Sequence, residues 1–157
     1  MTKYDFEISC VKEENSVYKK IFDAFGHTGS LMNLEVFESL DEQQKRVVCN
    51  VYFMVNSDRT AQILCPVNSS ENLDRPNGQK ATSVIAVNKA IKTCEKYDFA
   101  VDCYISSTPK SDMAKIFHFD GDITSAEVEG CSFYQMEKAQ NLNQNVLTKS
   151  SNNEKCM

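Results

Sequence analysis

One histidine and two aspartates stand at alternate positions in the C-terminal half of the chain: His118, Asp120 and Asp122. If the strand before them continues, all three side chains project from one face, where an imidazole and two carboxylates suit a divalent metal. The competing interpretation is a β-hairpin whose turn is Asp120-Gly121, because backbone geometry favours Asp-Gly in two-residue turns. The hairpin is favoured, so neither a metal nor a cofactor is predicted.

A second candidate for chemistry is His27, which stands in the corner Gly26-His27-Thr28-Gly29. An imidazole in a flexible corner could act as a general base. No nucleophile or carboxylate stands beside it in sequence, so a surface-turn histidine is the favoured interpretation. Cysteine–histidine catalysis stays open because such partners meet in space, but nothing selects one cysteine from seven. No motif carries catalysis by itself, which favours a non-enzymatic role.

A basic ridge is predicted on a helix over residues 79–97, where lysines recur three and four residues apart. Such a ridge could follow a single-stranded nucleic-acid backbone while a nearby aromatic ring stacks on a base. The alternative is a solvated helix face, which the net charge of −5 favours. The candidate binding residues are Lys80, Lys89, Lys92, Lys96, Arg75 and Tyr52.

The order of elements from Ser16 to Phe99 resembles that of phage single-strand annealing proteins. The likeness includes a hairpin that ends in Leu64-Cys65-Pro66-Val67, a polar loop, and a helix carrying Thr82, Ser83 and Lys89. Ala86 and Ala90 stand where that family usually has aromatic residues. The resemblance implies single-strand binding or annealing through the helix.

The elements that must position these residues follow from the period of the apolar side chains. Alternation predicts strands, and apolar residues three to four positions apart, such as Val84, Val87, Ile91 and Cys94, predict helices. The predicted order is strand 4–10, helix 17–25, strand 31–37, hairpin 47–55 with 60–65, helix 79–97, strands 99–105, 114–119 and 123–131, and a short helix around 133–136.

This order predicts an α+β fold. We expect a two-layer sandwich, in which two amphipathic helices cover a mainly antiparallel sheet of five to seven strands. Residues 1–140 are predicted to form a single domain. Residues 141–157 are rich in Asn, Gln and Ser and are predicted to be a disordered polar tail.

Composition narrows the class of protein. The chain has 157 residues, of which 22 are acidic and 17 are basic. Its seven cysteines form no CxxC pair, as is typical of cysteines that serve as small core residues in a reducing compartment. Neither a signal peptide nor a membrane span is recognisable, so a cytoplasmic protein with no membrane partner is predicted. We expect a small non-catalytic macromolecule-binding protein of the adaptor, inhibitor, immunity or chaperone type, acting through its sheet edge or a helix face. Its partner would be another protein, or single-stranded nucleic acid in the alternative, and self-association is left open.

Overall fold

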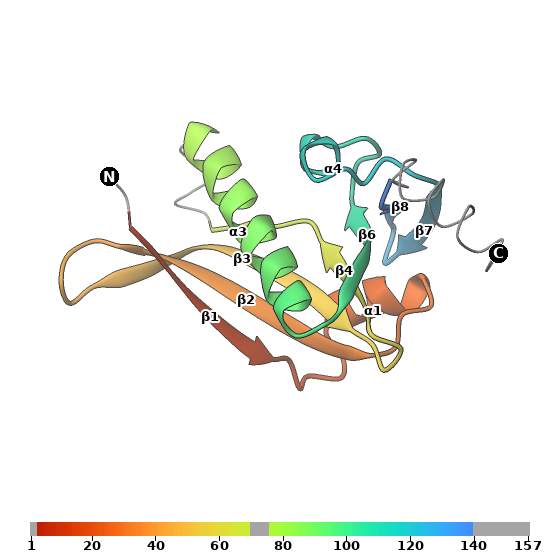
Figure 1. The fold of residues 1–157 in the computed structure, drawn as a ribbon, viewed down its shortest axis with the longest axis horizontal. Coiled ribbons are helices and arrows are strands. Elements are labelled where there is room, and N and C mark those ends of the chain that lie inside the picture. Colours follow the sequence, from red (N-terminus) through yellow and green to blue (C-terminus); the bar gives the residue numbers. More distant parts are fainter. Residues whose placement is uncertain (1–2, 70–75, 140–157) are drawn as a thin grey trace, which may run out of the picture.

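The computed structural model describes residues 3–69 and 76–139, and the side chains of all of these except 76–80. The predicted tail, residues 141–157, lies outside the described residues. Within the described residues no helix is both long enough and apolar enough to cross a membrane. The elements, shown in Figure 1, are β1 (Tyr4–Cys10), α1 (Val17–Ala24), β2 (Ser30–Ser39), β3 (Lys45–Val55), β4 (Thr60–Leu64), β5 (Val67–Asn68), α3 (Pro76–Lys96), β6 (Ala100–Ser106), α4 (Asp112–Ile116), β7 (Ile123–Val128) and β8 (Cys131–Glu137).

The strands form a single eight-stranded sheet in the order β1-β2-β3-β4-β6-β8-β7, with the short β5 paired to β3. All pairs are antiparallel except β4 with β6, which run parallel because α3 carries the chain back to the same end of the sheet. The predicted α+β class is confirmed. The sheet is mixed and larger than the five to seven strands predicted, and the described residues form three helices instead of two.

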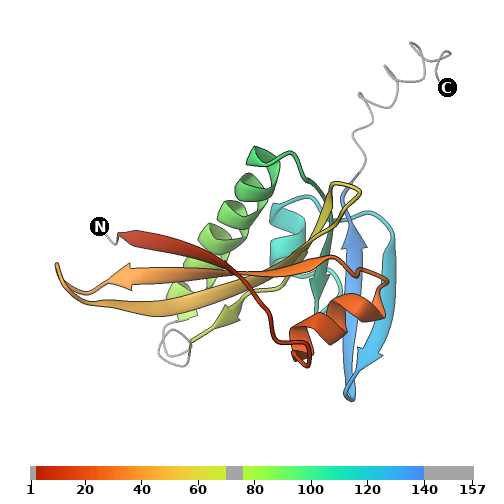
Figure 2. The same ribbon diagram turned by 90° about the horizontal axis from the view of Figure 1, so that it is seen from below.

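Both faces of the sheet are partly covered, which corrects the expected two-layer arrangement. Phe53 and Ile63 belong to the cluster under α3, whereas their neighbours Met54 and Leu64 belong to the cluster under α1. Because successive strand residues point to opposite faces, the two clusters lie on opposite sides of the sheet. Figure 2 shows α3 and α1 on either side of the long strands.

The long helix α3 packs its apolar stripe on the sheet, as expected for an amphipathic helix that covers it. The apolar stripe of α3 lies in the core cluster, with Val87 fully buried and Ile91 and Cys94 nearly so. The strand β3 lies between β2 and β4 and has buried residues on both faces, in agreement with its nearly continuous apolar sequence.

The predictions for residues 112–137 are wrong in three places. The predicted strand 114–119 begins inside the helix α4, which Ser111 caps by accepting a hydrogen bond at Oγ from the Ala114 amide. The hairpin turn is not at Asp120-Gly121 but at Glu129-Gly130, where both residues have positive φ. The segment predicted as a short helix around 133–136 is the strand β8.

Candidate functional site

The corner after α1 presents His27. The helix α1 ends at Ala24 with Phe25 as its C-cap, and Gly26 follows with a φ of 83°, a conformation that glycine adopts without strain. The His27 amide then donates back to the Phe22 carbonyl oxygen. At Gly29 a β-carbon would overlap the carbonyl oxygen of Val55. The corner is therefore packed directly against the end of β3.

The turn between β3 and β4 faces this corner. Asn56 holds the turn closed, since its Nδ2 lies 3.2 Å from Thr60 Oγ1 and 2.8 Å from Oε1 of the buried Gln62. Gln62 in turn donates through Nε2 to Oδ1 of Asp102, at 2.9 Å. Asp102 is the extra residue at an irregularity in the β4–β6 pairing, so the turn is connected by hydrogen bonds to a bulge in the neighbouring strand.

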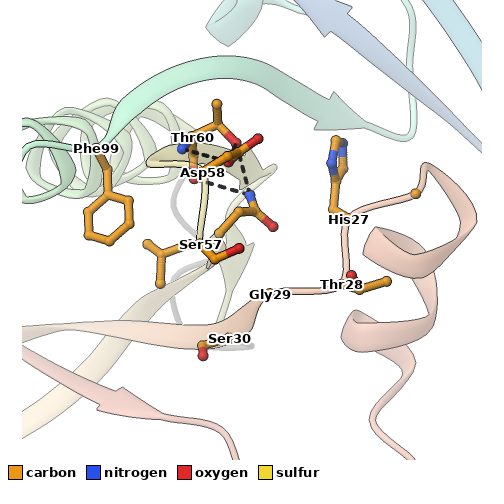
Figure 3. Close-up of a pocket in the computed structure, with 11 residues that line it drawn as sticks. His27, Thr28, Gly29, Ser30, Ser57, Asp58, Thr60 and Phe99 are labelled. Atoms are coloured by element: carbon orange, nitrogen blue, oxygen red, sulfur yellow. Dashed lines mark hydrogen bonds between the residues drawn. The ribbon is translucent and has the colours of Figure 1, made fainter.

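Corner and turn enclose a pocket of about 660 Å³, which we call the His27 pocket. It lies at the end of the sheet where β3 finishes and β2, β4 and β6 begin. Figure 3 shows His27 on one side, Asp58 and Thr60 on the turn, and Phe99 beyond the turn. Its lining consists of residues 26–30, residues 55–58, Thr60 and Phe99.

The ring of His27 is held by Gln135 of β8. The His27 Nε2 lies 2.5 Å from Gln135 Oε1. An amide oxygen only accepts hydrogen bonds, so Nε2 carries the proton and the neutral ring has its lone pair at Nδ1. Within the described part of the chain, Gln135 is the only hydrogen-bond partner of this ring. The arrangement leaves Nδ1 free to accept a proton.

Asp58, on the β3–β4 turn, adds a carboxylate to the lining of the same pocket. Its pKa is lowered, first by the hydrogen bonds that Thr60 donates from Oγ1 at 2.6 Å and from its amide at 3.1 Å, and least by the charge that His27 carries when its ring is protonated. The carboxylate is therefore ionised at neutral pH.

No family model and no curated protein sequence matches this chain. Two solved structures resemble it. An IAA acetyltransferase from Bacillus cereus ATCC 14579 has 12% sequence identity and a TM-score of 0.40, over 85% of this chain and 99% of that one. An acetyltransferase of the GNAT family from Staphylococcus aureus Mu50 has 12% identity and a TM-score of 0.37, over 82% of each chain.

These comparisons correct the function predicted from the sequence. Both solved structures are acetyltransferases, whereas the sequence favoured a non-catalytic binding protein, with single-strand nucleic-acid annealing as its alternative. Both predictions are therefore set aside. Of the sequence-based candidates for chemistry, His27 is the one that lies in the pocket described above.

The predicted basic ridge and its aromatic partner lie on different faces of the sheet. Lys89, Lys92 and Lys96 are exposed on α3, with Lys89 Nζ 5.2 Å from the ring centroid of Phe6. Tyr52 packs with the cluster under α1, where its ring stacks on Tyr18 at 3.8 Å between centroids. Arg75 and the side chain of Lys80 lie outside the described residues.

The three residues predicted as weak metal ligands do not share a strand. His118 follows α4 with a φ of 63°, and Asp120 and Asp122 lie in the connection to β7. Among residues 3–69 and 76–139, no group of three or more His, Cys, Asp or Glu side chains could hold a metal ion. The prediction that these residues bind no metal remains a prediction.

Three residues of the pocket region were not predicted from the sequence as site residues: Asp58, Thr60 and Gln135. Asp58 lies between the two strands of the predicted hairpin 47–55 with 60–65, but its hydrogen bond to Thr60 and its place in the His27 pocket depend on how the hairpin folds. Gln135 was assigned to a helix. No local pattern relates positions 27 and 135, since only the pairing of β8 with β6 brings them together.

Proposed function

We propose that the protein is an enzyme that transfers an acyl group to an amine or hydroxyl group of a small substrate, with His27 as the general base. The observation that carries the proposal is the His27–Gln135 hydrogen bond at the His27 pocket. It fixes the proton on Nε2 and leaves Nδ1 as the acceptor. Histidine is the side chain best suited to exchange a proton near neutral pH.

The nucleophile is assigned to the substrate and not to the protein. Within the described residues, no hydroxyl or thiol group is hydrogen-bonded to the His27 ring. The hydroxyl of Thr60 is already engaged by Asp58. A histidine with a vacant acceptor nitrogen and no protein nucleophile beside it suits direct attack by a bound amine or alcohol.

In this reaction the nucleophilic nitrogen or oxygen forms a bond to the acyl carbon, and its proton passes to His27 Nδ1. The bond between the acyl carbon and its leaving atom breaks, and the leaving group takes up a proton as His27 returns to its neutral form. Asp58 lines the same pocket, and its ionised carboxylate stabilises by its charge the imidazolium that exists between these two events. Acetyl transfer is the reaction to test first, since the two similar structures are described as acetyltransferases. The role of His27 rests on the pocket.

The test uses purified protein, acetyl-coenzyme A and a panel of small amines and alcohols, with release of free thiol as the signal. We expect turnover with at least one acceptor. His27→Asn should lower kcat by about 10²-fold to 10⁴-fold, the usual contribution of a general base. The matched control is His118→Asn, which changes the chain's other histidine outside the pocket. Absence of thiol release with every acceptor, or equal rates in wild type and His27→Asn, would contradict the proposal.

A further inference from the structure

The lining of the His27 pocket carries a fixed negative charge. Among the residues that line it, Asp58 is the only acidic one, and none is Lys or Arg. Because the pKa of Asp58 is lowered, its carboxylate is ionised at neutral pH. The charge of this pocket therefore favours a cationic ligand over an anionic one.

One oxygen of the Asp58 carboxylate is available to a ligand. Both hydrogen bonds from Thr60 go to Oδ1, one from the hydroxyl group at 2.6 Å and one from the amide at 3.1 Å. No further residue in the described part of the chain donates a hydrogen bond to Asp58, and Asp58 is exposed. Its Oδ2 can therefore accept a hydrogen bond from a molecule in the pocket.

The neighbouring cation, Arg59, is engaged elsewhere. Its φ is 69°, and its guanidinium lies 4.9 Å from the centroid of the Phe99 ring and donates through Nη1 to the Tyr97 carbonyl oxygen at 3.4 Å. None of the ion pairs formed by the described residues includes Asp58. Asp58 thus has no counter-ion among these residues, and a cationic ligand would supply one.

We propose that Asp58 is a specificity residue of the enzyme, which binds an ammonium group of the acceptor while a second amine of the same molecule lies at His27. This inference rests on the proposed function and names its substrate class, a short-chain diamine. Figure 3 shows the two side chains on different walls of the pocket, the carboxylate on the β3–β4 turn and the imidazole on the corner after α1. A linker between the two amines would cross the space between these walls. We call the Asp58 end of the pocket the ammonium site.

The size and the walls of the pocket suit such a molecule. A volume of about 660 Å³ is typical of small-molecule sites and leaves room for a diamine of a few carbon atoms beside an acyl group. Ser57 on the turn and Ser30 at the start of β2 add hydroxyl oxygens that can accept further hydrogen bonds from an ammonium group. An acceptor with a carboxylate in place of the ammonium group would be repelled by Asp58.

The test compares three acceptors of equal chain length in the acetyl-transfer assay. They are an α,ω-diamine, an alkylamine in which a methyl group replaces the second ammonium group, and an ω-amino acid in which a carboxylate replaces it. We expect kcat/KM to fall in this order. After correction for its two equivalent ends, the diamine should exceed the alkylamine by about threefold to fivefold, the effect of one solvent-exposed ion pair. Added salt should reduce this preference, because it screens the charges.

Asp58→Asn isolates the charge. The new side chain keeps Oδ1 as an acceptor for Thr60 and replaces Oδ2 by a donor group, so the preference for the diamine should disappear. The ratio of the two kcat/KM values is the readout, because loss of this charge also lowers the rate with every acceptor. Asp41→Asn is the matched control: Asp41 is another turn aspartate, which accepts hydrogen bonds at Oδ1 from the amides of Gln43 and Gln44 and lies outside the His27 pocket. A ratio that is unchanged in Asp58→Asn would overturn the inference.

Equilibrium binding separates this inference from the proposed function. The diamine, and a diol of the same length as its uncharged counterpart, are titrated into wild type, Asp58→Asn and Asp41→Asn without acetyl-coenzyme A, and binding is followed by NMR. If the diamine binds more tightly than the diol and only Asp58→Asn removes the difference, while no acceptor is acetylated, the ammonium site stands and the acyl-transfer proposal falls. If transfer occurs with equal kcat/KM for diamine and alkylamine, the ammonium site is overturned and the transfer stands. Absence of both binding and transfer overturns both.

Discussion

His27 and Gln135 are 108 positions apart in the chain, yet His27 Nε2 lies 2.5 Å from Gln135 Oε1. This hydrogen bond joins the corner after α1 to the strand β8. A second link runs in parallel, since Lys20 on α1 forms an ion pair at 2.9 Å with Glu129 in the β7–β8 turn. The candidate base is therefore held by a rigid strand and not only by its own flexible corner.

The first prediction concerns Gln135 as a positioning residue. Gln135→Leu removes the acceptor that orients the ring, so we expect kcat to fall about 10-fold to 100-fold, as when comparable supporting hydrogen bonds are lost elsewhere. Gln135→Glu keeps an acceptor oxygen and should retain activity. Its added negative charge stabilises the imidazolium, so the basic group in the pH–rate profile should titrate at higher pH. Equal losses in both variants, with no shift of the profile, would show that Gln135 is merely structural.

The second prediction concerns the two glycines of the corner. Gly29→Ala places a methyl group against the backbone of Val55 and within 2.7 Å of Asn56 Oδ1, so the corner must move and carry His27 with it. We expect a loss of about 2 kcal/mol in unfolding free energy together with loss of turnover. Gly26→Ala is the control: it meets no atom within 4 Å, and only its φ of 83° opposes a side chain, at about 1 kcal/mol. Urea unfolding measures both, and a larger loss for Gly26→Ala would contradict the packing argument.

Helices and strands were predicted best from the sequence where the periodic pattern of apolar residues extends over several repeats. The alternation from Tyr4 to Cys10 and the stripe from Val84 to Cys94 each repeat often enough to exclude the other period. Between residues 112 and 137 the segments are short. There a short alternating run of apolar residues is compatible with one helical turn as well as with a strand. The N-cap residue Ser111 stabilises the helix.

The site was harder to predict than the fold, for two physical reasons. A strand that is apolar on both faces does not reveal which face each residue takes, so nothing in the sequence placed Phe53 under α3 and Tyr52 on the opposite side. His27 could be named from its type and its glycine-flanked corner. Its partners could not, because they belong to a hairpin and a strand whose positions are fixed only by tertiary pairing.

The third prediction concerns the pKa of Asp58. Its two hydrogen bonds from Thr60 are the largest causes of the lowered pKa, and His27 contributes less. Thr60→Val should therefore raise the Asp58 pKa more than His27→Asn does, as measured by NMR titration of the side-chain carboxyl. Because the Asp58 pKa is lower in the folded protein, the ionised carboxylate stabilises the fold at pH values above its ordinary pKa. That contribution to the unfolding free energy is lost as the pH falls through the lowered pKa. A larger shift in His27→Asn than in Thr60→Val would reverse the assignment of causes.

The fourth prediction concerns thiol reactivity. Burial raises the pKa of Cys49 to about 12, and it also raises that of Cys103, whereas Cys10 and Cys131 are exposed. The thiolate is the nucleophile, so at pH 8 the two buried groups should resist iodoacetamide while Cys10 and Cys131 react. Peptide mass spectrometry after timed alkylation measures each site, and alkylation in denaturant provides the control in which all sites react. Rapid labelling of Cys49 in the folded protein would contradict this prediction. It would show that the sheet around β3 opens far more readily than the complete burial of Cys49 implies.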